Sequence, residues 1–242
     1  MVRRGIVNHE FELVLMKIGL FVMETRRKSG FARHDPRVTI HARMNQDNST
    51  WTKTDLRRSM RARLAAVDEN QLAEWSARLV KRLQMRREIW EKPGTAALFG
   101  GLRAEPDLVS TLMPWLAGQG WQTVFFRISE GMLEPRVVRD MGDLRRGRMG
   151  VWEPSMQTSP VPVGELTVIL VPGLMFSTKD GSRLGHGGGY YDRLLSQQGV
   201  RAPRLGVAFD AQLAENLPCE PHDMRVQSLA TESRFVESFP DG

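Results

Sequence analysis

The chain has 242 residues, enough for one domain or at most two, and its hydrophobic (41%) and charged (26%) fractions exclude a wholly disordered protein. Its formal net charge is +6, but residues 1–50 hold nine Lys and Arg against five Asp and Glu, so most of the excess lies there. The remainder is nearly balanced. This distribution disfavours a surface built for nucleic acid.

Cysteine and histidine exclude two further kinds of site. Cys219 is the only cysteine, so the chain can form neither an intramolecular disulfide nor a multi-cysteine zinc site. The five histidines lack the H-x-x-x-H spacing of a helical metal site, which disfavours a zinc enzyme. The single cysteine suits a protein of the reducing cytoplasm.

Residues 1–50 differ from the rest of the chain. Their apolar run at residues 11–23 is 13 residues long and is interrupted by Glu12 and Lys17, whereas a membrane span needs about 20 apolar residues. We therefore expect no membrane association. We expect residues 1–50 to be an N-terminal extension that is disordered or not translated, and residues 51–242 to form the functional domain.

Two helices are predicted after the extension. Leu56, Met60 and Leu64 recur at every fourth position, and residues 72–83 repeat the same helical spacing behind Asp68, a good N-cap. Short apolar strands then alternate with helices. We predict strands over residues 95–100, 123–128, 133–138, 166–171 and 205–209, and helices over residues 108–116 and 189–197.

This alternation predicts an α/β fold, in the form of a single three-layer domain with a mostly parallel sheet flanked by helices. In such folds ligands gather at the carboxyl ends of the strands. We therefore expect the ligand site at that edge of the sheet.

The most informative stretch is VPGLMFSTKDGSRLGHGGGYYDRLL, at residues 171–195. It places a glycine-dense turn between an apolar strand and a helix, where backbone amides can surround anionic oxygens. The helix start adds further donors and the positive end of its dipole. Arg183 supplies a cation, and Asp192 a hard oxygen ligand for the Mg²⁺ that accompanies nucleotide phosphates. The stretch therefore indicates nucleotide binding.

The glycine pattern differs from two better-known phosphate motifs. It lacks the Lys-Ser/Thr ending of a P-loop, and its G-x-G-G-G order does not fit the G-x-G-x-x-G of dinucleotide folds. A tight connection between strand and helix is the simpler interpretation of a glycine cluster alone. It leaves unexplained the arginine before the glycines and the two tyrosines and acid after them.

The segments VPGLMF and GSRLGHGGGYYDRLL resemble the signature of the 5-formyltetrahydrofolate cyclo-ligase (methenyltetrahydrofolate synthetase) family. Weaker landmarks agree in order: KTDLR at residues 53–57, the acid Glu105, WEP at residues 152–154, GVAFDAQ, and PHDM at residues 221–224. The resemblance covers about residues 51–235. It implies ATP-dependent conversion of 5-formyltetrahydrofolate to 5,10-methenyltetrahydrofolate, with release of ADP and phosphate.

The resemblance also implies site residues, because the family's motifs fall on positions of this chain. Arg183 and Tyr190 are the expected catalytic residues, and Asp192 and Asp223 the expected ligands of Mg²⁺. The expected ATP site comprises Lys53, Thr54, Asp55, Leu56, Arg57, Arg183, Leu184, Gly185, His186, Gly187, Gly188, Gly189, Tyr190 and Tyr191. The expected folate site comprises Arg57, Gly100, Glu105, His186, Gly187, Gly188, Gly189 and Tyr190. The expected partners are small molecules alone, with the protein a monomer.

Three positions depart from the family's common pattern. Ser177 stands where an aspartate is frequent, Phe126 where proline is common, and Gly100 where a larger apolar residue often touches folate. These changes leave open an alternative, a folate- or nucleotide-binding relative without turnover. A protein associated with nucleic acid through its basic first 50 residues is a second alternative.

Overall fold

A computed structural model describes residues 51–147, 150–237 and 239 of the chain. The expected extension over residues 1–50 lies outside this range. Among the residues described, no helix is long and apolar enough to cross a membrane.

The two helices predicted after the extension are both present. Helix α3 (Lys53–Ala65) begins at a capping box in which the Thr52 hydroxyl accepts from the Asp55 amide at 3.2 Å and the Asp55 carboxylate accepts from the Thr52 amide. Helix α4 (Glu69–Met85) begins at Asp68, whose carboxylate accepts from the Gln71 amide at 2.9 Å. The predicted Asp68 cap is therefore confirmed.

The central sheet has seven strands and is mostly parallel, as predicted. Their order is β12 (Phe235–Val236), β11 (Ser228–Ala230), β9 (Arg204–Val207), β6 (Val168–Val171), β1 (Thr95–Ala97), β2 (Gln122–Ser129) and β3 (Met132–Val137). The inner pairings are parallel, with Ala96 opposite both Thr123 of β2 and Val168 of β6, and the two edge strands are antiparallel.

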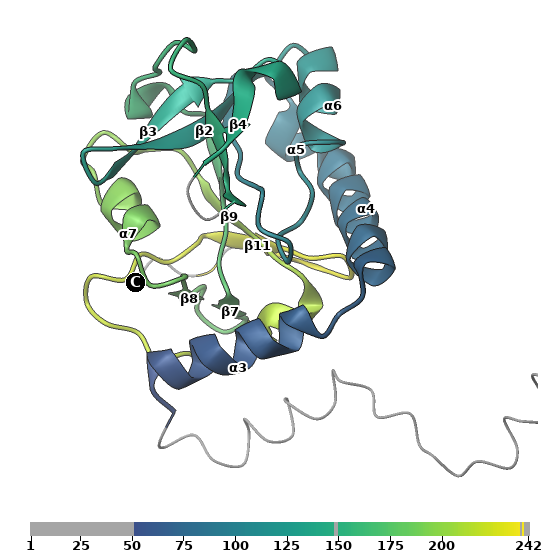
Figure 1. The fold of residues 1–242 in the computed structure, drawn as a ribbon, viewed down its shortest axis with the longest axis vertical. Helices are drawn as coiled ribbons and strands as arrows, with labels where there is room; N and C mark the ends of the chain where they lie inside the picture. The colour runs from purple at the N-terminus through teal and green to yellow at the C-terminus, as the bar shows by residue number, and fades with distance from the viewer. Residues whose placement is uncertain (1–50, 148–149, 238, 240–242) are drawn as a thin grey trace, which may run out of the picture. The chain divides into compact units, whose positions relative to one another are not determined.

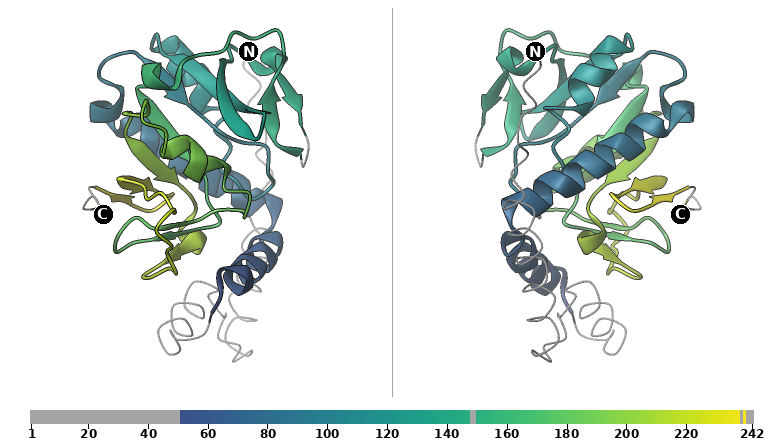
Figure 2. Two further views of the ribbon diagram at one scale, coloured as in Figure 1. Left: turned by 90° about the vertical axis from the view of Figure 1, so that its left-hand side faces the viewer. Right: turned by 90° about the vertical axis from the view of Figure 1, so that its right-hand side faces the viewer.

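Each face of the sheet buries its own hydrophobic core. Val168 and Leu170 of β6 point into one core, and Ile169 and Val171 into the other, as the twofold period of a strand requires. Helices α4 and α6 (Leu112–Gly118) cover the first face, and α7 (Tyr190–Leu195) covers the second, on the opposite side of the sheet in Figure 1. Figure 2 shows α4 running across its face. The three-layer arrangement is therefore confirmed.

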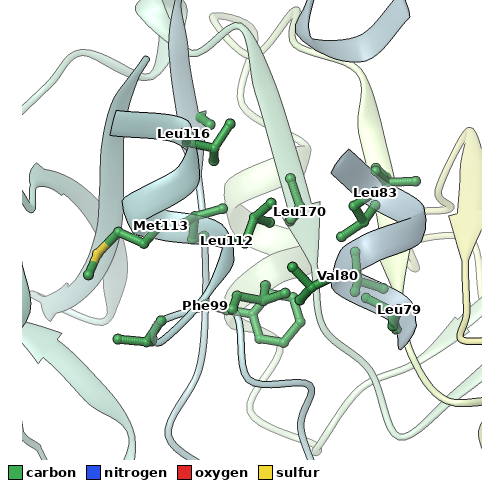
Figure 3. Packing of buried hydrophobic residues seen from close by; sticks show 14 of the residues in the cluster. Leu79, Val80, Leu83, Phe99, Leu112, Met113, Leu116 and Leu170 are labelled. Carbon is green, nitrogen blue, oxygen red and sulfur yellow. The ribbon is translucent and has the colours of Figure 1, made fainter. Parts of the chain in front are cut away.

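The core between α4, α6 and the sheet is built from long aliphatic side chains. Leu79, Val80 and Leu83 of α4 lie opposite Leu112, Met113 and Leu116 of α6, with Leu170 of β6 between them (Figure 3). Leu79, Leu83, Leu112, Leu116 and Leu170 are each fully buried. Burying a leucine contributes roughly 1.5–3 kcal/mol, so this core fixes the position of the strands that carry the site.

The connections leave a crevice at the carboxyl edge of the sheet. The crossover from β1 to β2 runs through α6 on one face, whereas the crossover from β6 to β9 runs through α7 on the other. Because β1 and β6 are neighbours and their connections diverge to opposite faces, a crevice is expected between their carboxyl ends.

Smaller elements surround this crevice. Strands β4 (Leu144–Arg146) and β5 (Trp152–Pro154) form a hairpin, and β7 (Met175–Ser177) pairs with β8 (Arg183–Leu184) and β10 (Leu213–Ala214). The turn between β2 and β3 has φ values of +51° at Glu130 and +78° at Gly131, which suits a two-residue hairpin turn. The short helix α5 (Arg87–Trp90) follows α4.

The predicted element boundaries were wrong at several points. The helix expected over residues 108–116 begins only at Leu112, because the Asp107 carboxylate binds the amides of Val109 and Ser110 and holds a turn before it. Pro114 then falls in the first helical turn, where its missing N–H removes no hydrogen bond. The strands expected to end at Gly100 and Phe209 end at Ala97 and Val207. After β1 the chain leaves the sheet to line the crevice, whereas Ala208 and Phe209 are buried in the hydrophobic cores.

Candidate active site

A cavity of about 1170 Å³ occupies the crevice between β1 and β6. Leu98, Phe99 and Gly100 line it directly after β1, and Pro172 directly after β6. The start of α3, the glycine segment at residues 185–189 and the loop at residues 218–224 form its other walls. Segments from both ends of the described chain therefore meet around one space.

Lys53 at the start of α3 binds the loop at residues 218–224. Its Nζ lies 2.5 Å from Asp223 Oδ2 and 3.1 Å from Glu220 Oε2. Burial alone favours the neutral form of Asp223, but the hydrogen bonds from Lys53 and from the Glu220 amide outweigh it and hold the pKa of Asp223 below its ordinary value. The pair therefore stays charged at neutral pH.

Two arginines of α3 hold the glycine segment. Arg57 Nε donates to the Gly185 carbonyl at 3.0 Å, and Arg61 Nη2 donates to the His186 carbonyl at 2.8 Å. These bonds use the carbonyls of the segment. Its amides from Gly185 to Tyr191 donate to no other described residue, so they remain available to an anion.

Backbone conformation explains why glycine is needed here. Gly187 has a φ of +108°, a value that side chains with a Cβ rarely adopt, and Gly189 at +65° begins α7 in the left-handed region. A Cβ built on Gly187 would lie 3.7 Å from Arg57 Nε, which is ordinary contact. The requirement at Gly187 is therefore backbone conformation and not space.

Arg183 is the most deeply buried cation of the cavity wall. Its side chain is 3% exposed, its Nη2 lies 2.6 Å from Asp192 Oδ1, and its Nη1 donates to the Pro172 carbonyl at 3.3 Å. Its Nε has no partner among the described residues. The Met224 amide also donates to Asp192 Oδ1, at 3.2 Å. This hydrogen bond links Asp192 to the loop that carries Asp223.

Glu105 is a buried acid in the cavity wall. Its side chain is 12% exposed, and its Oε2 accepts from the Leu102 amide at 3.3 Å. Burial raises the pKa of Glu105 to about 7, against the smaller opposing effect of that hydrogen bond. An acid in this setting exchanges its proton near neutral pH.

His186 and Tyr191 border the same region. His186 Nε2 lies 3.9 Å from Glu105 Oε1, while burial and then the cations Arg61, Arg183 and Arg57 lower the pKa of His186. Burial, with a further contribution from Glu105, raises the pKa of Tyr191. At neutral pH the imidazole and the phenol are therefore both uncharged.

An apolar wall completes the cavity, and sequence reasoning did not identify it. Phe125, Phe126, Ile128 and Leu133 come from the β2–β3 hairpin, and Trp152 from β5. The Arg146 guanidinium stacks on Trp152, 3.8 Å from the ring centroid, and Phe126 packs edge-on against Tyr191 at 5.7 Å. The WEP segment could have identified Trp152 as a site residue. For the residues of β2 and β3 the sequence offered only the alternation of apolar side chains, which does not indicate a site.

The structure brings most of the expected site residues together. Among those expected for ATP or folate, all line the cavity except Asp55 and Leu56. Asp55 caps α3, and Leu56 is buried beneath that helix. Both expected metal ligands line the cavity. The roles assigned to these residues stay predictions.

Two of the three departures from the family pattern lie in the cavity wall. Gly100 leaves open the space between Val109 and Trp152, because a Cβ there would lie 3.3 Å from Val109 Cγ2 and 3.8 Å from Trp152 Cδ1. Phe126 contributes to the apolar wall. Ser177 lies outside the wall: its hydroxyl donates to the Glu215 carbonyl and accepts from the Lys179 and Asp180 amides, which fixes a turn.

The donor set fits a hard divalent cation. Asp192 and Asp223 offer carboxylate oxygens, which Mg²⁺ prefers. One oxygen of each is already hydrogen-bonded, while Asp192 Oδ2 and Asp223 Oδ1 accept no hydrogen bond from the described residues. In the described part of the chain, the ligand atoms found within 4.8 Å of one another belong to Glu220, His222 and Asp223, a group that does not include Asp192.

The fold and this cavity place the chain among the doubly wound α/β proteins whose cavity opens at the carboxyl ends of their strands. Solved structures agree with that class. The NMR structure of Aquifex aeolicus 5,10-methenyltetrahydrofolate synthetase matches with a TM-score of 0.68 and 28% identity, over 78% of this chain and 94% of that one. A synthetase from Mycoplasma pneumoniae matches with a TM-score of 0.62 and 19% identity, which supports the fold alone.

Sequence comparison gives the family. The 5-formyltetrahydrofolate cyclo-ligase family model matches residues 49–232. The Escherichia coli K12 cyclo-ligase is 33% identical over 149 residues, which cover 59% of this chain and 80% of the relative. The matched part of the chain spans about half of the Mycolicibacterium smegmatis cyclo-ligase, 49% of its length at 37% identity. The chain belongs to the 5-formyltetrahydrofolate cyclo-ligase family.

Proposed function

We propose that this protein converts 5-formyltetrahydrofolate to 5,10-methenyltetrahydrofolate at the expense of ATP, with release of ADP and phosphate. Family membership supports the proposal. The observation that carries it is one cavity lined both by cations with open backbone amides, which we call the cationic half, and by apolar side chains with a buried acid, which we call the apolar half.

The cationic half suits ATP. Lys53, Arg57 and Arg183 line it. The amides of the glycine segment have no acceptor among the described residues, and phosphate oxygens are suitable acceptors for them. We assign Mg²⁺ to Asp192 and Asp223, where it would neutralise phosphate charge. Arg183 is held in place by Asp192, so its guanidinium is positioned before the nucleotide binds.

The other half suits the folate. We assign the pterin to Glu105, because its amino and ring N–H groups need a buried carboxylate acceptor. Gly100, Trp152 and Phe126 provide a flat apolar space beside it. His186, uncharged at neutral pH, lies between the two halves.

The chemistry then requires mainly positioning and charge stabilisation. The formyl oxygen is a poor leaving group, so transfer of the γ-phosphoryl group to it, with release of ADP, gives an iminium-like phosphate. Folate N10 attacks its carbon, and loss of the N10 proton and departure of phosphate leave the methenyl bridge. We propose that Arg183 stabilises the charge on the transferred group. Tyr190, in the wall beside the glycine segment, orients the folate. We expect a monomer in the cytoplasm, acting on small molecules and not on nucleic acid.

The direct test is to mix the purified protein with 5-formyltetrahydrofolate, ATP and Mg²⁺ and to follow methenyltetrahydrofolate by its absorbance. Product that forms only when ATP and Mg²⁺ are both present supports the proposal. ATP binding by folded protein without product would instead indicate the binding relative without turnover. Ser177 gives that alternative no support, because it lies outside the cavity wall.

We further propose that residues 51–242 are the catalytic domain. The family model begins at residue 49, and the helix that carries Lys53 is capped at Thr52. A protein lacking residues 1–43 should keep the kcat and KM of the full chain. Loss of activity or of solubility on this deletion would show that the extension is needed.

A further inference from the structure

The part of the cavity wall formed by α7 and the β2–β3 hairpin has no role in the assignments made so far. There α7 packs beside β3, and the wall includes Ile128 and Leu133 from the hairpin, Tyr190 and Arg193 from α7, and Ser196 directly after it. Ile128 is 42% exposed although it is a large apolar residue. This part of the wall is an open apolar trough with one cation beside it.

That cation, Arg193, differs from the other cations of the cavity wall. Four Lys and Arg side chains line the cavity in the described part of the chain. Lys53 is paired with Asp223, Arg183 with Asp192, and Arg57 binds the glycine segment. Arg193 forms no salt bridge with a described carboxylate, and its one hydrogen bond to another segment is from Nη2 to the Gly131 carbonyl at 3.1 Å.

The guanidinium of Arg193 is nevertheless held in place. Its Cζ lies 4.9 Å from the centroid of the Tyr190 ring, and the Gly131 bond ties it to the turn between β2 and β3. Among the described residues Nε and Nη1 have no acceptor, and Nη2 uses only one of its two hydrogens. The second Nη2 hydrogen, together with Nε or with Nη1, gives the planar pair of donors that a carboxylate accepts.

The folate carries the matching group. Its pterin is joined through a benzoyl ring to glutamate, whose carboxylates need a cation other than Lys53, Arg57 and Arg183, which are assigned to the phosphates. We propose that Arg193 is a specificity-determining residue that binds the glutamyl carboxylates of the substrate, with Ile128 and Leu133 supporting the benzoyl ring. This inference rests on the proposed function.

The test compares three substrates: 5-formyltetrahydropteroate, which lacks glutamate, and the monoglutamyl and triglutamyl forms of 5-formyltetrahydrofolate. Arg193→Gln should raise the KM for both glutamyl forms about tenfold, as expected for loss of one charge-assisted pair at a solvent-facing site. Its KM for the pteroate form and for ATP should stay at the wild-type values. Arg193→Lys should recover part of the loss.

Two controls separate the possible explanations. Arg87→Gln removes an exposed cation of α5 outside the cavity wall and should change none of these constants. If Arg193→Gln raises the KM for the pteroate form as much as for the glutamyl forms, Arg193 only positions Tyr190, and the proposal is overturned. If the wild-type protein turns over none of the three substrates, the proposed function itself fails, a result distinct from unequal effects among active variants.

Discussion

Arg183 Nη2 lies 2.6 Å from Asp192 Oδ1, so the buried cation just before the glycine segment and an expected metal ligand are paired with each other. The carboxylate cannot be removed without leaving a guanidinium that is 3% exposed and unpaired. Breaking a buried pair in this way costs roughly 3 kcal/mol or more. An alanine variant of Asp192 would therefore lose stability as well as any catalytic contribution, so its activity alone could not reveal the role of Asp192.

Asp192→Asn distinguishes the catalytic role of Asp192 from its contribution to stability. The amide keeps an oxygen for Arg183 and Met224 but removes the negative charge that favours Mg²⁺. We expect turnover to fall at least about a hundredfold and the Mg²⁺ concentration for half-maximal activity to rise. The melting temperature should lie below that of the wild type but above that of Asp192→Ala, because the amide oxygen keeps the hydrogen bonds while the buried guanidinium loses its counter-charge. Activity measured across a Mg²⁺ titration checks this, and an unchanged Mg²⁺ requirement would remove Asp192 from the metal site.

Lys53→Met tests the link between α3 and the loop at residues 218–224. Without Lys53, the carboxylates of Glu220 and Asp223 lose their cation, so we expect the free energy of unfolding to fall by roughly 1–2 kcal/mol. The KM for ATP should rise about tenfold if Lys53 also binds phosphate. Lys81→Met, at an exposed position of α4, is the matched control and should change neither quantity. A normal KM for ATP in Lys53→Met would leave Lys53 a purely structural role.

Gly187→Ala tests whether backbone conformation makes the anion site. At a φ of +108° an alanine is strained, so we expect a loss of about 1–2 kcal/mol in unfolding free energy or a shift of the segment, with weaker ATP binding in either case. Calorimetry measures both. Gly118→Ala is the control, because a Cβ there meets nothing within 4 Å and the residue lies in α6. It should be neutral or slightly stabilising.

Glu105→Gln should show opposite effects on stability and on folate binding. The pKa of Glu105 is about 7 in the fold against 4.5 ordinarily, so the wild type loses stability as the pH rises from about 4.5 to 7, by at most roughly 3 kcal/mol. Glutamine does not titrate. The free energy of unfolding of the variant should therefore rise relative to that of the wild type between about pH 4.5 and 7, and it should remain higher at pH 8. Denaturant unfolding at pH 5 and pH 8 checks the sign, and an equal difference at both pH values would contradict it.

The same variant should bind folate poorly, because an amide offers one acceptor oxygen where the carboxylate offers two. Substrate binding by the wild type should also weaken as the pH falls below about 7 and Glu105 becomes protonated. A pH-independent affinity would place the pterin elsewhere in the cavity.

Local sequence patterns predicted the parts of this fold that depend on local physics. The fourfold spacing in α3, the Asp68 cap of α4 and the apolar strands all act over a few residues, and all were found. The predicted start of α6 was wrong because the Asp107 side chain binds the backbone amide of Val109 and holds a turn before the helix. The small strands β7, β8 and β10 were missed because they depend on pairing partners distant in sequence.

The candidate site was only partly predictable for the same reason. The glycine segment could be recognised because its chemistry is contiguous. Asp223 came from the family resemblance alone, since its partner Lys53 is 170 positions away. Arg193 went unassigned because an arginine on a short helix has no distinctive pattern until the Gly131 carbonyl is seen beside it.

The pairing of Lys53 with Asp223 also sets an order of events during synthesis. A ribosome adding about 5–20 residues per second exposes the start of α3 on the order of ten seconds or more before Asp223 emerges. Through that interval Lys53 has no acid to bind, and Leu56, Met60 and Leu64 have not reached their buried positions. The ATP end of the cavity is therefore among the last parts of the domain to be completed, and the nascent chain depends on its final segment to close it.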